Sequence, residues 1–177
     1  MEKKFGQIMQ MAFVVDDFDK AIEFWTKKMN VGPFLKIENV EFKELYYKEK
    51  ATNLDFSGAL SYTGNMQIEL IKQYCDTPSI YTEYVNNEKG PLHHVCALTT
   101  DIKNDITVME SEGYKIIQGG KMQDDGQFVY LHSEDKKEPI LELLEFSENW
   151  LSFFSSIENA SKNWDRSTAI MKTEIKL

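Results

Sequence analysis

The chain has 177 residues, of which 42% are hydrophobic, and its formal net charge is −9 at pH 7. This length allows one substantial core or two small fused modules. The acidity argues against nucleic acid or an anionic membrane as a partner, because both select for basic patches. Two cysteines are too few for a disulfide framework, and the sequence has neither a secretion signal nor a membrane-spanning apolar run. We therefore expect a soluble, reduced, cytoplasmic protein.

The first 75 residues are predicted to form a βαβββ module. A buried strand over Gly6–Val15 is followed by Asp16 or Asp17, either of which can cap a helix by accepting hydrogen bonds from its first turn. The helix has an apolar face at helical spacing and ends at Asn30-Val-Gly-Pro33. Three strand-like segments follow, at Phe34–Tyr47, Leu54–Tyr62 and Met66–Lys72.

Residues 76–91 are predicted to be a linker helix, after which residues 92–146 repeat the same order of elements. The linker has Pro78 near its start and ends at Glu88-Lys-Gly-Pro91. The second module is predicted to consist of a strand at Leu92–Thr99, a helix at Asp101–Glu112, and strands at Tyr114–Gln118, Phe128–His132 and Ile140–Phe146. Residues 147–177 are a C-terminal extension, in which Ser147 can cap a helix that packs on the body or on a second subunit of a homodimer. The predicted class is therefore α+β.

The two modules carry polar residues at matching positions. Gln10 opens the first strand of one module, and His94, which is 84 positions later, opens the first strand of the other. Glu69 and Glu142 lie in the last strands, in the matching contexts Gln67-Ile-Glu69-Leu and Ile140-Leu-Glu142-Leu. A carboxylate inside an apolar strand needs a cation, a donor or a proton, because burying its charge alone costs several kcal/mol.

A pseudo-twofold axis between the modules would bring these four residues into one site. If the strands are neighbours, Gln10 meets Glu69 and His94 meets Glu142. One amide oxygen, one imidazole and two carboxylates suit a divalent ion such as Zn, Ni, Co, Mn or Fe, and leave positions open for substrate. Each residue alone has a simpler explanation, as a hydrogen-bonded strand residue, a core histidine or a solvent-facing glutamate. Their matched positions favour metal ligands at Gln10, Glu69, His94 and Glu142.

With these residues identified, the chain resembles the vicinal oxygen chelate superfamily, which includes glyoxalase I, methylmalonyl-CoA epimerase, extradiol dioxygenases and bleomycin resistance proteins. The resemblance covers roughly residues 6–146. It rests on Gln10-x-Ala-x-Val-Val-x-Asp17, Phe24-Trp25 with Val31-Gly-Pro-Phe34, Gln67-Ile-Glu69-Leu, Leu92-His-His94-Val and Ile140-Leu-Glu142-Leu-Leu. It implies two tandem βαβββ modules around a cleft that holds the metal, with ligands at the four positions above.

The resemblance also implies an activity, that of a metal-dependent lyase or isomerase acting through an enolate on a small oxo-acid, hydroxy-acid or acyl thioester. Glu142 is the favoured base, with Glu69 as the other candidate. Gln10 makes an iron dioxygenase a poor match, because that branch uses a second histidine. The alternative is a drug-binding or resistance protein without catalysis. Further candidates are Lys48 and Lys50 for glutathione or coenzyme A, and aromatic residues for the cleft wall, at Phe34, Tyr47, Phe56, Tyr62 and Tyr130.

Overall fold

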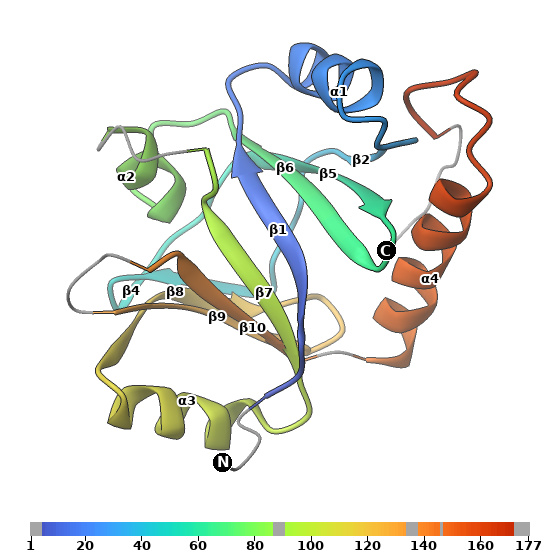
Figure 1. Ribbon diagram of the computed structural model, residues 1–177. Coiled ribbons are helices and arrows are strands. Elements are labelled where there is room, and N and C mark those ends of the chain that lie inside the picture. The colour runs from blue at the N-terminus through green and yellow to red at the C-terminus, as the bar shows by residue number, and fades with distance from the viewer. Residues whose placement is uncertain (1–4, 87–90, 134–137, 146, 172–177) are drawn as a thin grey trace.

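The computed structural model describes residues 5–86, 91–133, 138–145 and 147–171. The helices are α1 (Phe18–Lys27), α2 (Ile80–Asn86), α3 (Ile102–Ser111) and α4 (Glu148–Lys162). The strands are β1 (Ile8–Val14), β2 (Leu35–Ile37), β3 (Glu44–Tyr47), β4 (Lys50–Ala51), β5 (Phe56–Thr63), β6 (Met66–Gln73), β7 (His94–Thr99), β8 (Tyr114–Lys121), β9 (Gln127–Ser133) and β10 (Ile140–Glu145) (Figure 1). The predicted α+β class is confirmed. The predicted end of the linker helix at residues 87–90, and Phe146, lie outside the described residues.

All strands belong to one sheet, in the order β2-β5-β6-β1-β7-β10-β9-β8-β3-β4. The first strands of the two halves, β1 and β7, are antiparallel neighbours at its centre (Figure 1). In their register Met11 lies opposite Val95, and these two residues are 84 positions apart, as are Gln10 and His94. A pseudo-twofold axis therefore passes between Met11 and Val95, at the centre of the sheet.

The expected strand over residues 34–47 is divided between the two halves. Only β2 pairs with β5 in its own half, whereas β3 crosses over and pairs with β8. Asn39 has φ of 52°, which turns the chain away from β2 after Ile37. Close pairing with β8 depends on Gly120, where an added Cβ would collide with the carbonyl oxygen of Glu44. The prediction of one continuous segment missed this crossover because it depends on a contact with a distant strand.

Helices α1 and α3 cover the outer faces of the two halves and begin alike. The Asp17 carboxylate accepts a hydrogen bond from the Lys20 backbone N–H at 3.0 Å, and Asp101 accepts one from Asn104 at 3.2 Å. Both helices pack an apolar face on the sheet, in two separate hydrophobic clusters. The capping predicted from the sequence is confirmed, with Asp17 as the first cap.

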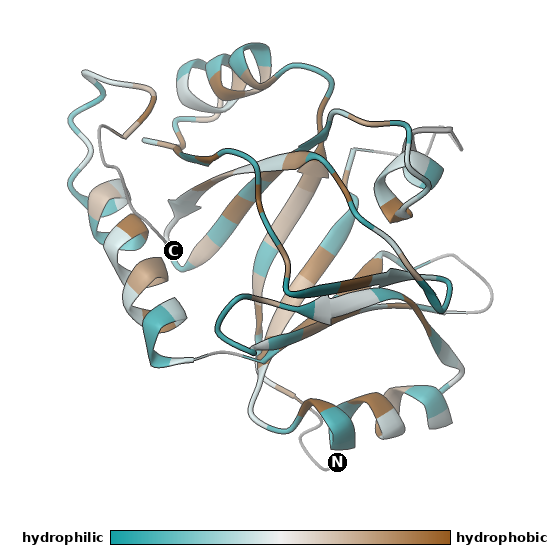
Figure 2. Cartoon of the chain, turned by 180° about the vertical axis from the view of Figure 1, so that it is seen from behind, coloured by the Kyte–Doolittle hydropathy of each residue, from teal (hydrophilic) through white to brown (hydrophobic). Residues whose placement is uncertain are grey.

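The inner faces of the two halves pack against each other. One buried cluster joins Phe56 and Ile71 from the first half to Phe128 and Tyr130 from the second. Figure 2 shows hydrophilic residues interrupting the otherwise hydrophobic central strands. Polar side chains therefore occur inside the core as well as at the surface.

Helix α4 packs against the body of the protein, mainly on β5. Ser147 caps it, and its buried residues join an apolar cluster with the first half, comprising Leu35, Leu60, Tyr62, Phe153, Phe154 and Ile157. Leu151 is 40% exposed and points away from this cluster. Among the helices that the structure describes, none has the length and apolar character needed to cross a bilayer.

Candidate metal centre

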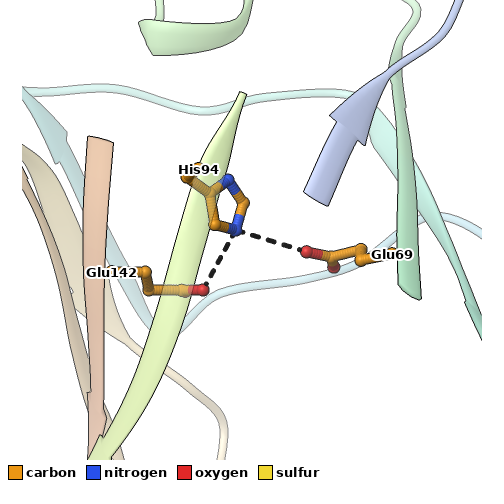
Figure 3. Close-up of side chains that lie close together, drawn as sticks. All are labelled: Glu69, His94 and Glu142. Atoms are coloured by element: carbon orange, nitrogen blue, oxygen red, sulfur yellow. Dashed lines mark ion pairs between the residues drawn. The ribbon is translucent and has the colours of Figure 1, made fainter. Parts of the chain in front are cut away.

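Glu69 on β6, His94 on β7 and Glu142 on β10 converge inside the core. The Nε2 atom of His94 lies 3.5 Å from Glu69 Oε2 and 3.2 Å from Glu142 Oε2, with the carboxylates approaching from opposite sides (Figure 3). One potential ligand atom from each residue lies within 4.8 Å of the others. The structure therefore brings together three of the four predicted ligands, drawn from both halves of the sheet.

The strand register explains this convergence. Ala12 on β1 is the direct neighbour of Glu69 on one side and of His94 on the other, and its methyl group leaves space between them. On β10, Glu142 lies opposite Cys96 rather than His94. The predicted meeting of His94 and Glu142 is therefore made across a register offset of two residues, and an offset of two keeps both side chains on the same face of the sheet.

Gln10 lines the same cavity as Glu69 and Glu142. Its Nε2 donates a hydrogen bond of 2.6 Å to Gln67 Oε1, and Gln67 Nε2 donates one of 3.0 Å to the Tyr62 hydroxyl. This chain of contacts leaves the buried Gln10 Oε1 without a hydrogen-bond partner. Gln67 therefore orients the Gln10 amide so that its oxygen is available to a cation. Gln67 lies two residues before Glu69 on β6, on the same face of the strand, and this spacing was the sequence signal that could have identified it as a supporting residue.

His93 supports His94 from the other side. The two Nδ1 atoms are 2.8 Å apart, and His93 Nε2 lies 3.4 Å from the carbonyl oxygen of Ile80. If His93 donates from Nε2 to that carbonyl, its Nδ1 accepts the proton of His94 Nδ1. The Nε2 of His94 is then the nitrogen that faces the carboxylates, as a metal ligand requires.

The electrostatics of the cluster favour a positive charge between the carboxylates. Burial lowers the pKa of His94, but the close negative charges of Glu142 and Glu69 outweigh this and raise it to about 9. Burial also raises the pKa of Glu69, and His94 partly offsets that rise. Two carboxylates share a single cationic partner, so the pocket can accept further positive charge.

These residues fit a divalent ion. Within the part of the chain that the structure describes, the buried side-chain atoms without a hydrogen-bond partner are Gln10 Oε1 and His94 Nε2. Both belong to the predicted ligand set, and both are atoms that coordinate metals. An amide oxygen, an imidazole nitrogen and two carboxylates suit Zn, Ni, Co, Mn or Fe, as expected from the sequence.

The predicted aromatic wall is present only in part. Phe56 and Tyr130 line the cavity, whereas Phe34 is buried under α1 and Tyr47 lines a separate groove. Tyr62 contributes through its hydrogen bond to Gln67. No sequence pattern indicated that Tyr81, Trp150 and Phe154 also line the cavity, because they come from α2 and α4, outside the repeated strands.

The two lysines considered for a phosphate-bearing group lie away from the cluster. Lys48 Nζ is 3.1 Å from Glu83 Oε2, beside the groove that Lys72 also lines. Lys50 is exposed on the short strand β4. Neither residue lines the cavity that holds Gln10, Glu69 and Glu142.

Solved structures share this fold at low sequence identity. Methylmalonyl-CoA epimerase from Mycobacterium tuberculosis matches with a TM-score of 0.60 at 15% identity, covering 86% of this chain and 95% of that chain. A hypothetical protein from Bacillus halodurans C-125 matches with a TM-score of 0.59 at 14% identity, covering 80% and 95%. Streptomyces coelicolor methylmalonyl-CoA epimerase in complex with 2-nitronate-propionyl-CoA matches with a TM-score of 0.52 at 13% identity, covering 81% and 96%. These likenesses establish the fold alone.

Sequence comparison gives the family directly. A search of curated proteins finds no match. A family model matches residues 9–130, which is more than half of the chain and includes Gln10, Glu69 and His94. The resemblance inferred from the repeated strands is confirmed, and the chain belongs to the Glyoxalase/Bleomycin resistance protein/Dioxygenase superfamily.

Proposed function

We propose that the protein is a metal-dependent lyase or isomerase of the glyoxalase type, which moves a proton on a small oxo-acid, hydroxy-acid or acyl thioester. The observation that carries this proposal is the position of two carboxylates, the buried Glu142 and the partly buried Glu69, on either side of His94, in a cavity that also contains the unpartnered oxygen of Gln10. A carboxylate held beside a substrate carbon in such a cavity can act as a general base.

Gln10, Glu69, His94 and Glu142 would hold the divalent ion. When bound, this ion would coordinate two adjacent substrate oxygens and stabilise the negative charge that develops on them. Glu142 accepts the proton from the neighbouring carbon. Glu69 approaches from the opposite side of His94 and is placed to return a proton from there (Figure 3). One base suffices for a lyase, whereas an epimerase uses both.

Two tyrosines add hydrogen-bond donors to the same cavity. The hydroxyls of Tyr81 and Tyr130 are 3.1 Å apart, and both residues line the cavity with the glutamates. Burial raises the pKa of both hydroxyls, so they stay protonated at neutral pH. A protonated hydroxyl can donate to a substrate oxygen as negative charge develops on it. The epimerases with the same fold support proton transfer as the class of reaction.

The test combines elemental analysis with solvent deuterium exchange. The purified protein should contain about one divalent ion per chain. NMR in D2O would follow exchange in methylmalonyl-CoA, pyruvate, and the hemithioacetal of methylglyoxal and glutathione. Glu142→Gln should slow exchange by about 10²–10⁴-fold. Glu145→Gln is the matched control, because Glu145 lies on the same strand but does not line the cavity. A metal-free protein, or full exchange by Glu142→Gln, would contradict the proposal.

The alternative of a drug-binding protein without catalysis is less well supported. The cavity has a volume of about 90 Å³. Drug-sized ligands occupy pockets of roughly 300–1,000 Å³. Calorimetric titration with bleomycin would detect such a function, and tight binding without any proton exchange would favour it.

A further inference from the structure

The cavity has a polar end and an apolar end. Gln10, Glu69 and Glu142 form the polar end, and the remaining wall is mostly aliphatic and aromatic. Helix α4 supplies Trp150 and Phe154 to the apolar end, although α4 lies beyond the residues that match the family model. The C-terminal extension therefore contributes to the shape of the site.

Helix α4 is held firmly in this position. Phe153, Phe154 and Ile157 are buried. Near the far end of the helix, Ser161 Oγ accepts a hydrogen bond of 3.1 Å from the backbone N–H of Tyr62 on β5. The Trp150 ring packs against Phe154, with ring centroids 5.5 Å apart. These contacts fix the Trp150 side chain relative to the strand that carries Tyr62.

Trp150 stands between the cavity and a larger outer groove. This groove has a volume of about 720 Å³, and it shares with the cavity a wall made of Ile37, Val40, Met122 and Trp150. Its other lining residues include the acidic side chains of Glu38, Glu41 and Asp124. Removing the indole ring would take away the part of this shared wall that Trp150 forms.

Gly58 limits the cavity at the other end. It lines the cavity on β5, and a Cβ atom added there would lie 3.7 Å from Glu69 Oε1, an ordinary van der Waals distance. A methyl group at position 58 would thus reduce the space beside Glu69 without a collision. The cavity can be enlarged at Trp150 and reduced at Gly58.

We propose that Trp150 is a specificity-determining residue that sets the length of the apolar group a substrate can carry. The inference rests on the proposed function. One water occupies about 10–15 Å³ on this measure, so a cavity of about 90 Å³ holds roughly six to nine non-hydrogen atoms. The substrate is a compact compound with two adjacent oxygens at the polar end and a short apolar group directed at Trp150.

Alkyl hydroxamic acids of increasing length test this proposal, because they offer two adjacent oxygens on a variable chain. Acetohydroxamic to octanohydroxamic acid would be titrated calorimetrically into the metal-loaded protein. Each methylene that finds room should strengthen binding about fourfold. In the wild type this gain should stop at about four carbons and then reverse. Trp150→Ala should move the optimum to longer chains by two or more carbons and Trp150→Phe by less, whereas Gly58→Ala, beside Glu69 at the polar end, should weaken binding at every chain length.

Leu151→Ala is the control on the same helix, because Leu151 is exposed and does not line the cavity. Its length profile should match that of the wild type. An unchanged optimum in a folded Trp150→Ala variant would overturn the proposal.

Linear alcohols from propanol to octanol separate the size limit at Trp150 from the proposed metal chemistry, since they lack the chelating group. Their binding is followed by the NMR signal of the Trp150 indole N–H in the wild type, and by the Tyr81 and Tyr130 side-chain signals in Trp150→Ala. Failure of every hydroxamic acid, with a Trp150-dependent length limit for alcohols, would refute the metal chemistry and retain the size limit.

Discussion

The two halves of the sheet place equivalent residues with the same geometry but support them differently. Gln10 and His94 are related by the axis between Met11 and Val95, and Glu69 and Glu142 hold matching positions on β6 and β10. In the first half Gln67 holds the Gln10 amide, whereas in the second half His93 contacts the imidazole of His94. The duplicated strands thus fix where the ligands lie, and neighbouring residues specific to each half fix which atom each ligand presents.

The halves also differ in the walls they give the cavity. In the register with the last strands, Leu60 lies opposite Glu69, and Tyr130 lies opposite Glu142. Two residues earlier on each of these strands, Gly58 in the first half occupies the position that Phe128 occupies in the second. At these matched positions the first half therefore leaves space where the second provides an aromatic ring, and Tyr130 adds a hydroxyl. A symmetric scaffold consequently holds an asymmetric cavity, as recognition of an asymmetric substrate requires.

The largest expected difference between the halves is in metal affinity. His94→Ala removes the imidazole nitrogen and leaves the buried Glu142 and the partly buried Glu69 without their cationic partner. The affinity of this variant for the metal ion should fall by more than roughly 10–100-fold, which is the loss typical when a residue that only supports a ligand is changed. Gln10→Ala removes a neutral amide oxygen, a weaker donor, and should cost less. Calorimetric titration with Zn²⁺ or Ni²⁺ measures both, and equal losses would show that the two ligands contribute equally.

The supporting residues provide the next comparison. Gln67→Leu frees the Gln10 amide to turn, and His93→Phe removes the partner of His94 Nδ1. Each should lower metal affinity by about 10–100-fold while all four ligands remain. Tyr84→Phe is a suitable control, because its hydroxyl bonds to the carbonyl of Leu92 and lies outside the cavity. Unchanged affinity in Gln67→Leu would contradict the role assigned to Gln67.

Between neutral pH and about pH 9 the pH dependence should come mainly from the second half, because only that half has an imidazole in the cluster. His94 has its pKa raised to about 9 without metal, so metal binding must displace its proton below that pH. Apparent affinity should fall by up to tenfold per pH unit as pH drops below about 9. The metal-free fold should show the opposite trend, since the charged His94 stabilises it fully below pH 6.5 and this stabilisation is lost as pH rises through about 9. Titrations in buffers of different ionisation enthalpy would count the protons released, and a count of zero would rule out this linkage.

The smallest expected effects concern the two helix caps, which allow the two halves to be compared at equivalent positions far from the site. Asp17→Ala and Asp101→Ala each remove one acceptor at the start of an outer helix, with similar hydrogen-bond lengths. Each should reduce the free energy of unfolding by about 1 kcal/mol, with metal affinity unchanged. Chemical denaturation measures the first quantity. A clear inequality between the two variants would mean that the helices contribute differently to the fold.

Much of the site could be predicted because its residues follow a repeat. The matched contexts of Glu69 and Glu142 identified two carboxylates in apolar strands, and the structure places both beside His94. The expected contact between His94 and Glu142 is present at 3.2 Å, although the strand register places Glu142 opposite Cys96, two residues further along β7. A shift of two leaves the sequence pattern of inward and outward residues unchanged, so periodicity alone could not detect it.

The sequence by itself determined the starts of the outer helices, the existence of two equivalent halves and the set of residues able to hold a metal. These features are local or periodic, so they can be read along the chain. Only the tertiary structure decided that β3 joins the other half, that Gln67 and His93 orient the ligands, and that Trp150 closes the apolar end of the cavity. Each of these depends on packing between segments that lie far apart in sequence or on the rotation of a side chain, and no local pattern encodes such contacts.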